Sequence, residues 1–208
     1  ALQPLNALII LPASLVFNWQ RELAQFAPSI FVYAHVGPNR QKHLSTLSTH
    51  DVVLTTYHTA RQDLALLEKV NWKFIVLDES QQIKNRESDI SKVVRGLRGQ
   101  HKISLSGTPI ENSLADLWTQ MEFINPAALG SYPSFRDQFQ TPIERQGDEQ
   151  AKSSLFNRVQ PFFLRRTKEE VAPELPPLSN QIFYCEMAEA QRKRYEGVLS
   201  LDALREDS

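Results

Sequence analysis

Two adjacent carboxylates, Asp78 and Glu79, directly follow an unbroken apolar run in the segment FIVLDESQQ (residues 74–82). Carboxylates bind cations and accept protons, so the pair is a candidate for catalysis. Acids at the end of a strand are, however, more often helix caps, turn residues or part of a solvated edge, and the pair alone does not decide between these roles. The interpretation depends on the elements that position the two acids.

The apolar run before the acids is one of several β-rich runs that alternate with stretches of helical periodicity. Strands are expected within residues 5–12, 31–36, 51–57, 72–80 and 101–107, and helices within residues 14–27, 59–70 and 88–97. This alternation predicts an α/β fold with a parallel sheet that is covered by helices on both faces.

Polar residues follow four of these strands, in the order Ser14, then Thr55 and Thr56, then Asp78 and Glu79, then Ser106, Gly107 and Thr108. In an open α/β sheet, ligands bind in the crevice beyond the carboxyl ends of the strands. The sequence therefore predicts that the acid pair lies at the ligand-facing edge of the sheet.

Helical periodicity dominates after residue 111. The segment NSLADLWTQMEFINP (112–126) predicts a helix that is capped at Asn112 or Ser113, and its apolar face is formed by Leu114, Leu117, Trp118, Met121 and Ile124. Shorter helical pieces are expected at 134–140 and 153–164, with a loop from Ile143 to Gln150 between them. A proline-containing connector (165–177), a strand (180–187) and a helix (188–206) complete the chain. We predict three parts: an α/β lobe (1–111), a helical insertion (112–165) and a connecting segment (166–208).

Composition excludes several classes of protein. The 23 Lys and Arg residues nearly balance the 24 Asp and Glu residues, so net charge gives no argument for or against an anionic partner. The five histidines lack the spacing of a metal site, and the single cysteine, Cys185, alternates within a predicted strand as a buried residue does. No apolar run approaches the roughly 18 residues of a membrane span. We expect a soluble, intracellular (cytoplasmic) protein with no membrane partner.

Several motifs occur in a fixed order around the acids, and together they resemble one known family. They are LIILPASLVFNWQRELAQF (8–26), DVVLTTYHTARQD (51–63), FIVLDESQQIKN (74–85), HKISLSGTPIENSLADLWTQMEFINP (101–126), PFFLRRTKEEVAPELPP (161–177) and AEAQRKRY (188–195). The chain resembles, over nearly its whole length, the Swi/Snf family of DNA-translocating ATPases within helicase superfamily two. That family usually has Gly-His, Ala-His or Ala-Gln after the acid pair, whereas Ser80 and Gln81 follow here; both acids are retained.

The resemblance implies ATP and Mg²⁺ as cofactors and gives the acid pair its roles. Asp78 would hold the Mg²⁺ that bridges the ATP phosphates, and Glu79 would orient or deprotonate the attacking water. The segment at Ser106, Gly107 and Thr108 resembles the one that senses the nucleotide state in this family. Gln81 is a candidate hydrogen-bond partner for Ser106 or Thr108.

Duplex DNA is the partner that the resemblance implies. Pro12, Ser14, Thr55 and Thr56 match positions from which the family contacts DNA phosphates, although capping of a helix is an alternative role for Ser14. Arg165 and Arg166 match an arginine pair near the junction with the second RecA-like lobe and are further candidates for DNA contact. Trp19, Phe26 and Trp118 each lie on the apolar face of a predicted helix, and we assign these three side chains to packing.

A phosphate-binding loop of the form G-x-x-x-x-G-K-[ST] does not occur in these residues, because none of the seven glycines precedes a lysine. The resemblance places this loop upstream of LIILP and a second RecA-like lobe downstream of Ser208. We therefore expect a part of the first RecA-like lobe, without its first strand and phosphate loop but with a helical insertion, and expect it to be inactive alone.

The sequence predicts part of an ATP-dependent enzyme that translocates along duplex DNA and remodels protein–DNA complexes. A noncatalytic scaffold or DNA-binding module of the same fold is an alternative, and a Gly-Lys-Thr or Gly-Lys-Ser loop upstream would favour the enzyme. An RNA helicase is disfavoured because NSLADLW and FFLRRT resemble the DNA-translocating branch. A phosphatase of the Asp-x-Asp class is disfavoured because Ser80 stands at its third position.

Overall fold

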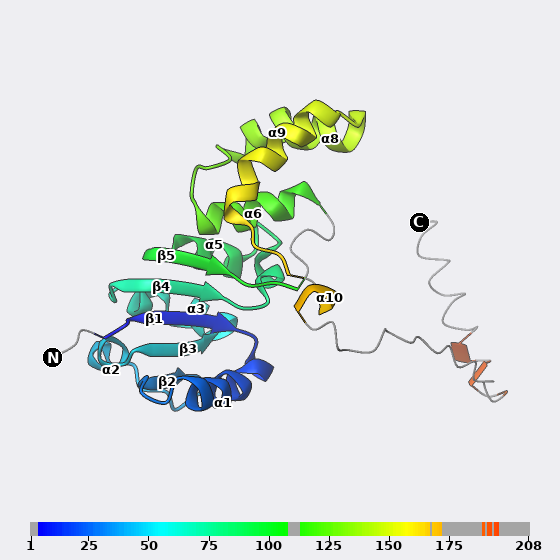
Figure 1. Ribbon diagram of the computed structural model, residues 1–208. Coiled ribbons are helices and arrows are strands. Elements are labelled where there is room, and N and C mark those ends of the chain that lie inside the picture. Colours follow the sequence, from blue (N-terminus) through cyan, green and yellow to red (C-terminus); the bar gives the residue numbers. More distant parts are fainter. Residues whose placement is uncertain are drawn as a thin grey trace. The chain divides into compact units, whose positions relative to one another are not determined.

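The computed structural model describes residues 4–107, 113–166, 168–171, 189, 191, 192, 194 and 195. The chain forms two compact units, residues 1–162 and 163–208, and the first contains the sheet and the helices beside it (Figure 1). Thr108, Cys185, the predicted strand at 180–187 and most of the proline-containing connector lie outside the described residues.

A five-stranded parallel sheet forms the centre of the first unit (Figure 1). Its strands are β1 (Ala7–Leu11), β2 (Val32–His35), β3 (Val52–Thr56), β4 (Trp72–Leu77) and β5 (Gly99–Ser104). They stand in the order β2-β3-β1-β4-β5, and every neighbouring pair is parallel. The carboxyl ends therefore lie at one edge, as the alternating pattern predicts.

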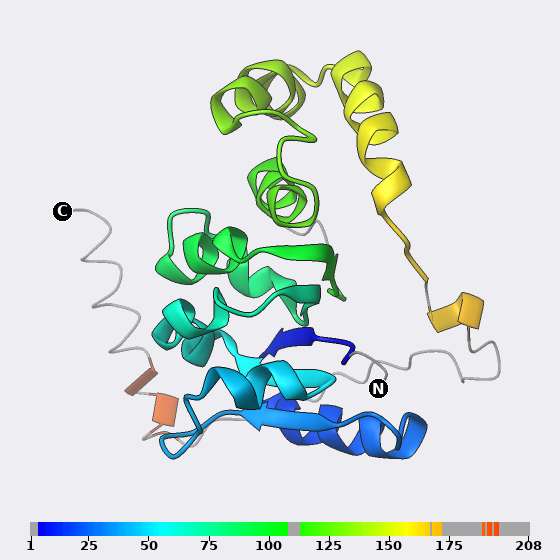
Figure 2. The same cartoon turned by 90° about the vertical axis from the view of Figure 1, so that its left-hand side faces the viewer.

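Apolar side chains cover both faces of the central strands, because the side chains of a strand alternate between the two faces of the sheet. In the buried strand β1, Leu8 and Ile10 belong to one core cluster, whereas Ala7, Ile9 and Leu11 belong to the other. Helix α1 (Val16–Phe26) packs on the second cluster, and α3 (Tyr57–Gln62), α4 (Leu64–Leu67) and α5 (Asp89–Gly96) lie on the first (Figures 1 and 2). The predicted α/β fold is confirmed.

Short elements connect the strands. After β1 comes a 3-10 turn, η1 (Ala13–Leu15), and after β4 comes a second, η2 (Ser80–Ile83). Helix α2 (Leu44–Thr49) precedes β3 and buries Leu47 in the first core cluster. The predicted helix at 59–70 is divided, because α3 ends before Asp63 and α4 begins after it.

Helix α6 (Leu114–Ile124) begins at Ser113, whose side chain accepts a hydrogen bond from the backbone N–H of Asp116. Its buried residues include Leu117, Trp118 and Met121 of the predicted apolar face. Further short helices follow: α7 (Tyr132–Phe135), the π-helical turn η3 (Arg136–Gln140), α8 (Thr141–Gln146), α9 (Glu149–Val159) and η4 (Gln160–Phe162). Helix α10 (Lys168–Val171) belongs to the second unit.

Two expectations about these helices are wrong. The predicted loop from Ile143 to Gln150 is mostly helical, because a two-residue turn is enough to connect α8 to α9. Gly147 adopts a left-handed conformation (φ 66°) that ends α8, and the Asp148 side chain caps α9. The side chain of Phe26, which we assigned to packing, is 73% exposed at the last position of α1. Within the described residues, no helix is long and apolar enough to span a membrane.

Candidate functional site

The acid pair lies between the ends of β1 and β5, at the carboxyl edge of the sheet. The backbone N–H of Asp78 donates to the carbonyl of Ile10 in β1 at 2.9 Å. On the other side, the N–H of Ser80 donates to the carbonyl of Leu105 at 3.0 Å, just beyond β5. These bonds continue the sheet ladder past the strand ends and hold the backbone on both sides of Glu79.

Two hydrogen bonds orient the Asp78 carboxylate. The indole Nε1–H of Trp19 donates to Oδ2 at 2.6 Å, and the backbone N–H of Glu79 donates to Oδ1 at 2.9 Å. The assignment of Trp19 to packing is confirmed, because its ring packs on the apolar face of the sheet, but the bond to Asp78 is a contact that the sequence reasoning missed. A half-buried indole N–H needs an acceptor, and this carboxylate supplies it.

Tyr57 holds the backbone of Asp78 from α3. Its hydroxyl donates to the Asp78 carbonyl oxygen at 2.8 Å, and its side chain is buried. Burial raises the pKa of the Tyr57 phenol far above its ordinary value, and the charges of Asp78 and Glu79 raise it further. The phenol therefore keeps its proton and remains a donor to this carbonyl.

Glu79 has an unusual backbone conformation. It stands in the left-handed region, with φ 50° and ψ 52°, which costs energy for a residue that has a Cβ. The change of direction at Glu79 ends the path of β4 and leads into η2. Strained residues of this kind are concentrated at functional sites, which favours a functional interpretation of the pair.

Gln81 connects Glu79 to the segment after β5. Its side-chain amide Nε2 donates to Oε2 of Glu79, and its Oε1 accepts a hydrogen bond from the Ser106 hydroxyl at 3.1 Å. The predicted contact between Gln81 and Ser106 is confirmed. The amide donates at one end and accepts at the other, so two hydrogen bonds connect the Ser106 hydroxyl to the Glu79 carboxylate. Gly107 is exposed beside Ser106.

The residues predicted to contact phosphates differ in accessibility. Ser14 is exposed within η1 after Pro12, and no side-chain cap forms at the start of η1 or of α1, so the capping alternative is not supported. Thr55 is fully buried, and its hydroxyl donates to the carbonyl of His35 at 2.9 Å. Thr56 is partly buried and caps α3. The Thr55 hydroxyl therefore cannot contact a phosphate directly.

Arg165 and Arg166 are both exposed and belong to the second unit. Their proposed contact with DNA stays a prediction.

A second charged cluster, which the sequence reasoning missed, lies beyond the ends of β2 and α3. The buried carboxylate of Asp63 accepts hydrogen bonds from His35 Nε2 at 2.9 Å and from Arg40 Nε, and it forms an ion pair with Lys42 at 3.1 Å. Burial alone would raise the pKa of Asp63, but the bonds from Arg40, Lys42 and His35 outweigh it and lower the pKa to about 2. Its partners are 21 to 28 residues away, so no local pattern indicates the cluster.

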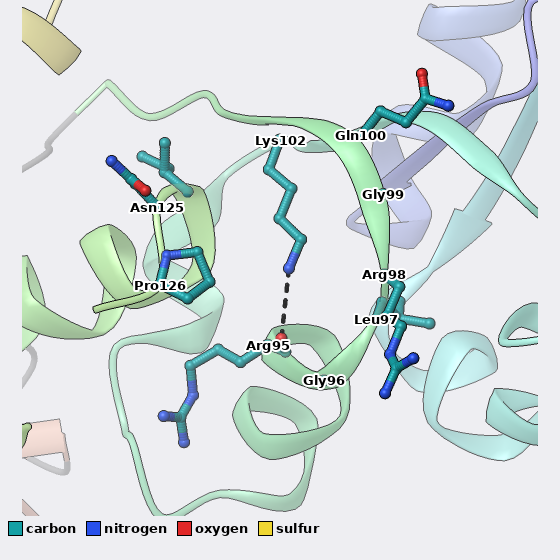
Figure 3. A pocket seen from close by; sticks show the side chains of 10 residues that line it. Arg95, Gly96, Leu97, Arg98, Gly99, Gln100, Lys102, Asn125 and Pro126 are labelled. Carbon is teal, nitrogen blue, oxygen red and sulfur yellow. Dashed lines mark hydrogen bonds between the residues drawn. The ribbon is translucent and has the colours of Figure 1, made fainter. Parts of the chain in front are cut away.

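A cavity lies at the amino end of β5, and neither Asp78 nor Glu79 lines it (Figure 3). It has a volume of about 430 Å³ and is lined by Arg95, Arg98 and Lys102 among others. The Lys102 ammonium donates to the Arg95 carbonyl at 3.4 Å, and Arg95 itself donates to the carbonyls of Arg86 and Ser91. These basic groups stabilise the end of α5.

The donor set at the acid pair fits a magnesium ion that is shared with a ligand. Each carboxylate oxygen of Asp78 accepts one hydrogen bond, which leaves further lone pairs for a cation. In the described part of the chain no group of three or more His, Cys, Asp or Glu side chains could enclose a metal ion. Mg²⁺ in phosphoryl-transfer sites is held by one or two carboxylates plus phosphate oxygens, which matches this geometry.

Comparisons with known proteins agree with the geometry. The family model described as SNF2-related domain matches residues 4–207. The chain is 40% identical to the TATA-binding protein-associated factor mot1 of Schizosaccharomyces pombe over 200 residues, covering 90% of this chain and 10% of that protein. It is 42% identical to the putative ATP-dependent helicase/translocase YwqA of Bacillus subtilis over 194 residues, covering 91% of this chain and 21% of that protein.

A solved structure, the Sulfolobus solfataricus SWI2/SNF2 ATPase core in complex with dsDNA, matches with a TM-score of 0.74 and 44% identity. The match covers 82% of this chain and 35% of that one. A second solved structure, the Sulfolobus solfataricus SWI2/SNF2 ATPase core domain, matches with a TM-score of 0.71 and 40% identity, over 96% of this chain and 40% of that chain. The chain thus spans between about a tenth and two fifths of the proteins to which it is similar.

Proposed function

This chain belongs to the SNF2-related family, and we propose that it forms part of an ATP-dependent enzyme that translocates along duplex DNA and remodels protein–DNA complexes. One observation carries the proposal: two carboxylates are held in fixed orientations at the carboxyl edge of a parallel sheet, and one of them is connected through Gln81 to Ser106. That edge is where α/β sheets bind their ligands.

In the proposed reaction the two acids have separate tasks. Asp78 would hold Mg²⁺, which when bound with ATP neutralises charge on the phosphates. The Trp19 and Glu79 N–H groups keep the Asp78 carboxylate in one orientation. Glu79 would orient the attacking water and accept a proton at its carboxylate, and Gln81 holds that carboxylate in place.

Ser106, Gly107 and Thr108 would report the state of the nucleotide. The Ser106 hydroxyl bond to Gln81 supports this role, because it gives the segment after β5 a direct connection to Glu79. A second RecA-like lobe of the full-length chain would complete the nucleotide site.

Duplex DNA is the proposed partner, and the enzyme would act wherever DNA lies inside the cell. Pro12 and Ser14 stand at the same edge as the acids, and the exposed Ser14 hydroxyl is free of capping bonds. Thr56, Arg165 and Arg166 are further candidates. A similar ATPase core has been solved with dsDNA, which supports the choice of partner. Similarity to a TATA-binding protein-associated factor supports a DNA-bound protein as the target that is remodelled.

Replacement of Glu79 by Gln in the full-length enzyme tests the proposed function. The variant should lose at least about a hundredfold in DNA-stimulated ATP hydrolysis, because the amide cannot accept a proton, while ATP binding persists. Glu87→Gln is the matched control: its side chain is 64% exposed and pairs only with the surface cations Arg86 and Lys92, so hydrolysis should be unchanged. Near-normal turnover in Glu79→Gln would remove Glu79 from the mechanism.

The 208 residues by themselves contain no G-x-x-x-x-G-K-[ST] loop to hold the phosphates, so we propose that they do not hydrolyse ATP alone. Measuring phosphate release from ATP by this chain, with and without duplex DNA, tests this prediction.

A further inference from the structure

The Asp78 carboxylate accepts a hydrogen bond from the indole of Trp19, which lies in helix α1. Among the described residues, no other side chain from a different element is seen to donate to this carboxylate. We infer that Trp19 is a positioning residue that couples the proposed DNA-contacting turn η1 to the proposed magnesium ligand Asp78. This inference rests on the proposed function and adds to it a route by which DNA regulates ATP hydrolysis.

The Trp19–Asp78 hydrogen bond restricts the terminal side-chain torsion of Asp78. The terminal torsion of an aspartate has a broad, roughly two-fold preference, so a carboxylate with one partner can swing. The Glu79 N–H holds Oδ1 from the same turn of backbone, and the Trp19 indole holds Oδ2 from outside it. With both bonds in place, the plane of the carboxylate is set, and the remaining lone pairs point in fixed directions.

The geometry of this indole differs from that of the other two tryptophans. Trp72 and Trp118 donate to the backbone carbonyls of Leu67 and Gly130 at 2.9 and 3.1 Å, as buried indoles that only pack commonly do. Trp19 instead donates to a side-chain carboxylate, at 2.6 Å. A carboxylate is not needed to satisfy an indole that only packs.

A continuous piece of backbone joins the indole to the predicted phosphate contacts. Turn η1 ends at Leu15 and α1 begins at Val16, so Trp19 lies about one helical turn beyond the end of η1. Leu15 and Val16 pack with Trp19 against the same face of the sheet. A phosphate that binds at the exposed Ser14 therefore acts on the segment that carries the indole, and a small shift of α1 changes the bond to Asp78.

Two consequences follow for the enzyme. Loss of the indole N–H should raise the Mg²⁺ concentration needed for half-maximal hydrolysis by about tenfold, the low end of the range for residues that orient a metal ligand. It should also reduce the factor by which duplex DNA stimulates hydrolysis, because α1 then no longer holds the carboxylate.

The test replaces only the N–H. In the full-length protein, Trp19 is substituted by benzothienylalanine, whose sulfur stands where the indole has N–H and whose ring has nearly the same shape. Trp19→Phe is measured beside it. Mg²⁺ affinity is determined by calorimetry with a non-hydrolysable ATP analogue, and the Mg²⁺ dependence of hydrolysis is determined with and without duplex DNA. The same benzothienyl replacement at Trp118 is the control, because it removes an indole N–H bond that does not touch the acids.

Weaker Mg²⁺ affinity and lower DNA stimulation at position 19, with neither at position 118, are expected. Unchanged Mg²⁺ affinity in the Trp19 isostere, in a protein that hydrolyses ATP normally, would overturn the coupling and leave the proposed function intact. A wild-type protein without DNA-stimulated hydrolysis, or one whose hydrolysis survives Glu79→Gln, would overturn the proposed function and the coupling with it. A purely structural role would lower the melting temperature in both isosteres without moving the Mg²⁺ dependence.

Discussion

Replacing Asp63 by Asn should destabilise the chain measurably, because one carboxylate serves three cationic or polar partners. The Asp63 and Arg40 side chains are 4% and 8% exposed, so the substitution leaves the Arg40 guanidinium buried without its counter-charge. The amide of Asn can still accept a hydrogen bond, so the change isolates the loss of charge from the loss of shape.

The magnitude follows from the pKa of the carboxyl group. A pKa that falls from its ordinary 3.8 to about 2 means that the folded state favours the ionised form. At about 1.4 kcal/mol per pKa unit, this favours folding by about 2 kcal/mol at neutral pH. We expect Asp63→Asn to lower the free energy of unfolding at pH 7 by about that amount, or more where the unpaired Arg40 adds a cost.

The pH dependence has a definite sign. Because the folded pKa of Asp63 is depressed, its contribution is fully present above about pH 4 and is lost as the pH falls through about 2, so roughly half remains at pH 3. Burial also lowers the pKa of His35, and its contribution is likewise present above its ordinary value of 6.5 and lost on acidification. Wild-type stability should therefore fall in two stages as the pH is lowered.

Urea unfolding at pH 7, 5 and 3, followed by circular dichroism, measures these differences. The difference in free energy of unfolding between wild type and Asp63→Asn should be no smaller at pH 5 than at pH 7, because Asp63 also favours protonated His35, and it should be clearly smaller at pH 3. Asp89→Asn is the matched control: its carboxylate is 77% exposed and lies 3.8 Å from Arg61, so it should cost less than about 1 kcal/mol. A gap at Asp63 no larger than that of the control, or one that does not shrink by pH 3, would refute the argument.

Two further substitutions test other parts of the structure. Ser14→Ala in the full-length enzyme should weaken binding to duplex DNA of any sequence by a similar factor, since phosphate contacts carry no sequence information. Filter binding at several salt concentrations measures this, and unchanged binding would remove Ser14 from the interface. Gly99→Ala should lower the free energy of unfolding by about 1–3 kcal/mol, because the new Cβ would lie 2.8 Å from Cγ1 of the fully buried Ile75. In the control Gly96→Ala the new Cβ meets nothing within 4 Å. Equal melting temperatures for the two variants would contradict the packing argument.

Local information was enough for the fold class and for the position of the acid pair. Strand and helix periods, and the polar residues that end each apolar run, are properties of short segments, and they predicted a parallel sheet with Asp78 and Glu79 at its carboxyl edge. The family resemblance suggested the contact between Gln81 and Ser106, and the structure shows that the two residues follow neighbouring strands of that sheet.

The burial of individual side chains was not predictable in the same way. It depends on where neighbouring elements cover a helix or strand, and the helical or strand period does not contain that information. Phe26 lies on the expected helix face but is exposed at the end of α1. Thr55 and Thr56 are adjacent in sequence, yet only Thr55 is fully buried. Its hydroxyl donates a hydrogen bond to the carbonyl of His35 in the neighbouring strand.

The tertiary structure alone decided which distant groups meet at the acids and in the Asp63 cluster. Trp19 and Asp78 are 59 residues apart, and Asp63 and His35 are 28 apart. A helical pattern assigns an indole to an apolar face but cannot reveal that its N–H finds a carboxylate at the end of a strand. Hydrogen bonds are short and directional, so they are determined by the final positions of packed elements rather than by the pattern that forms each element.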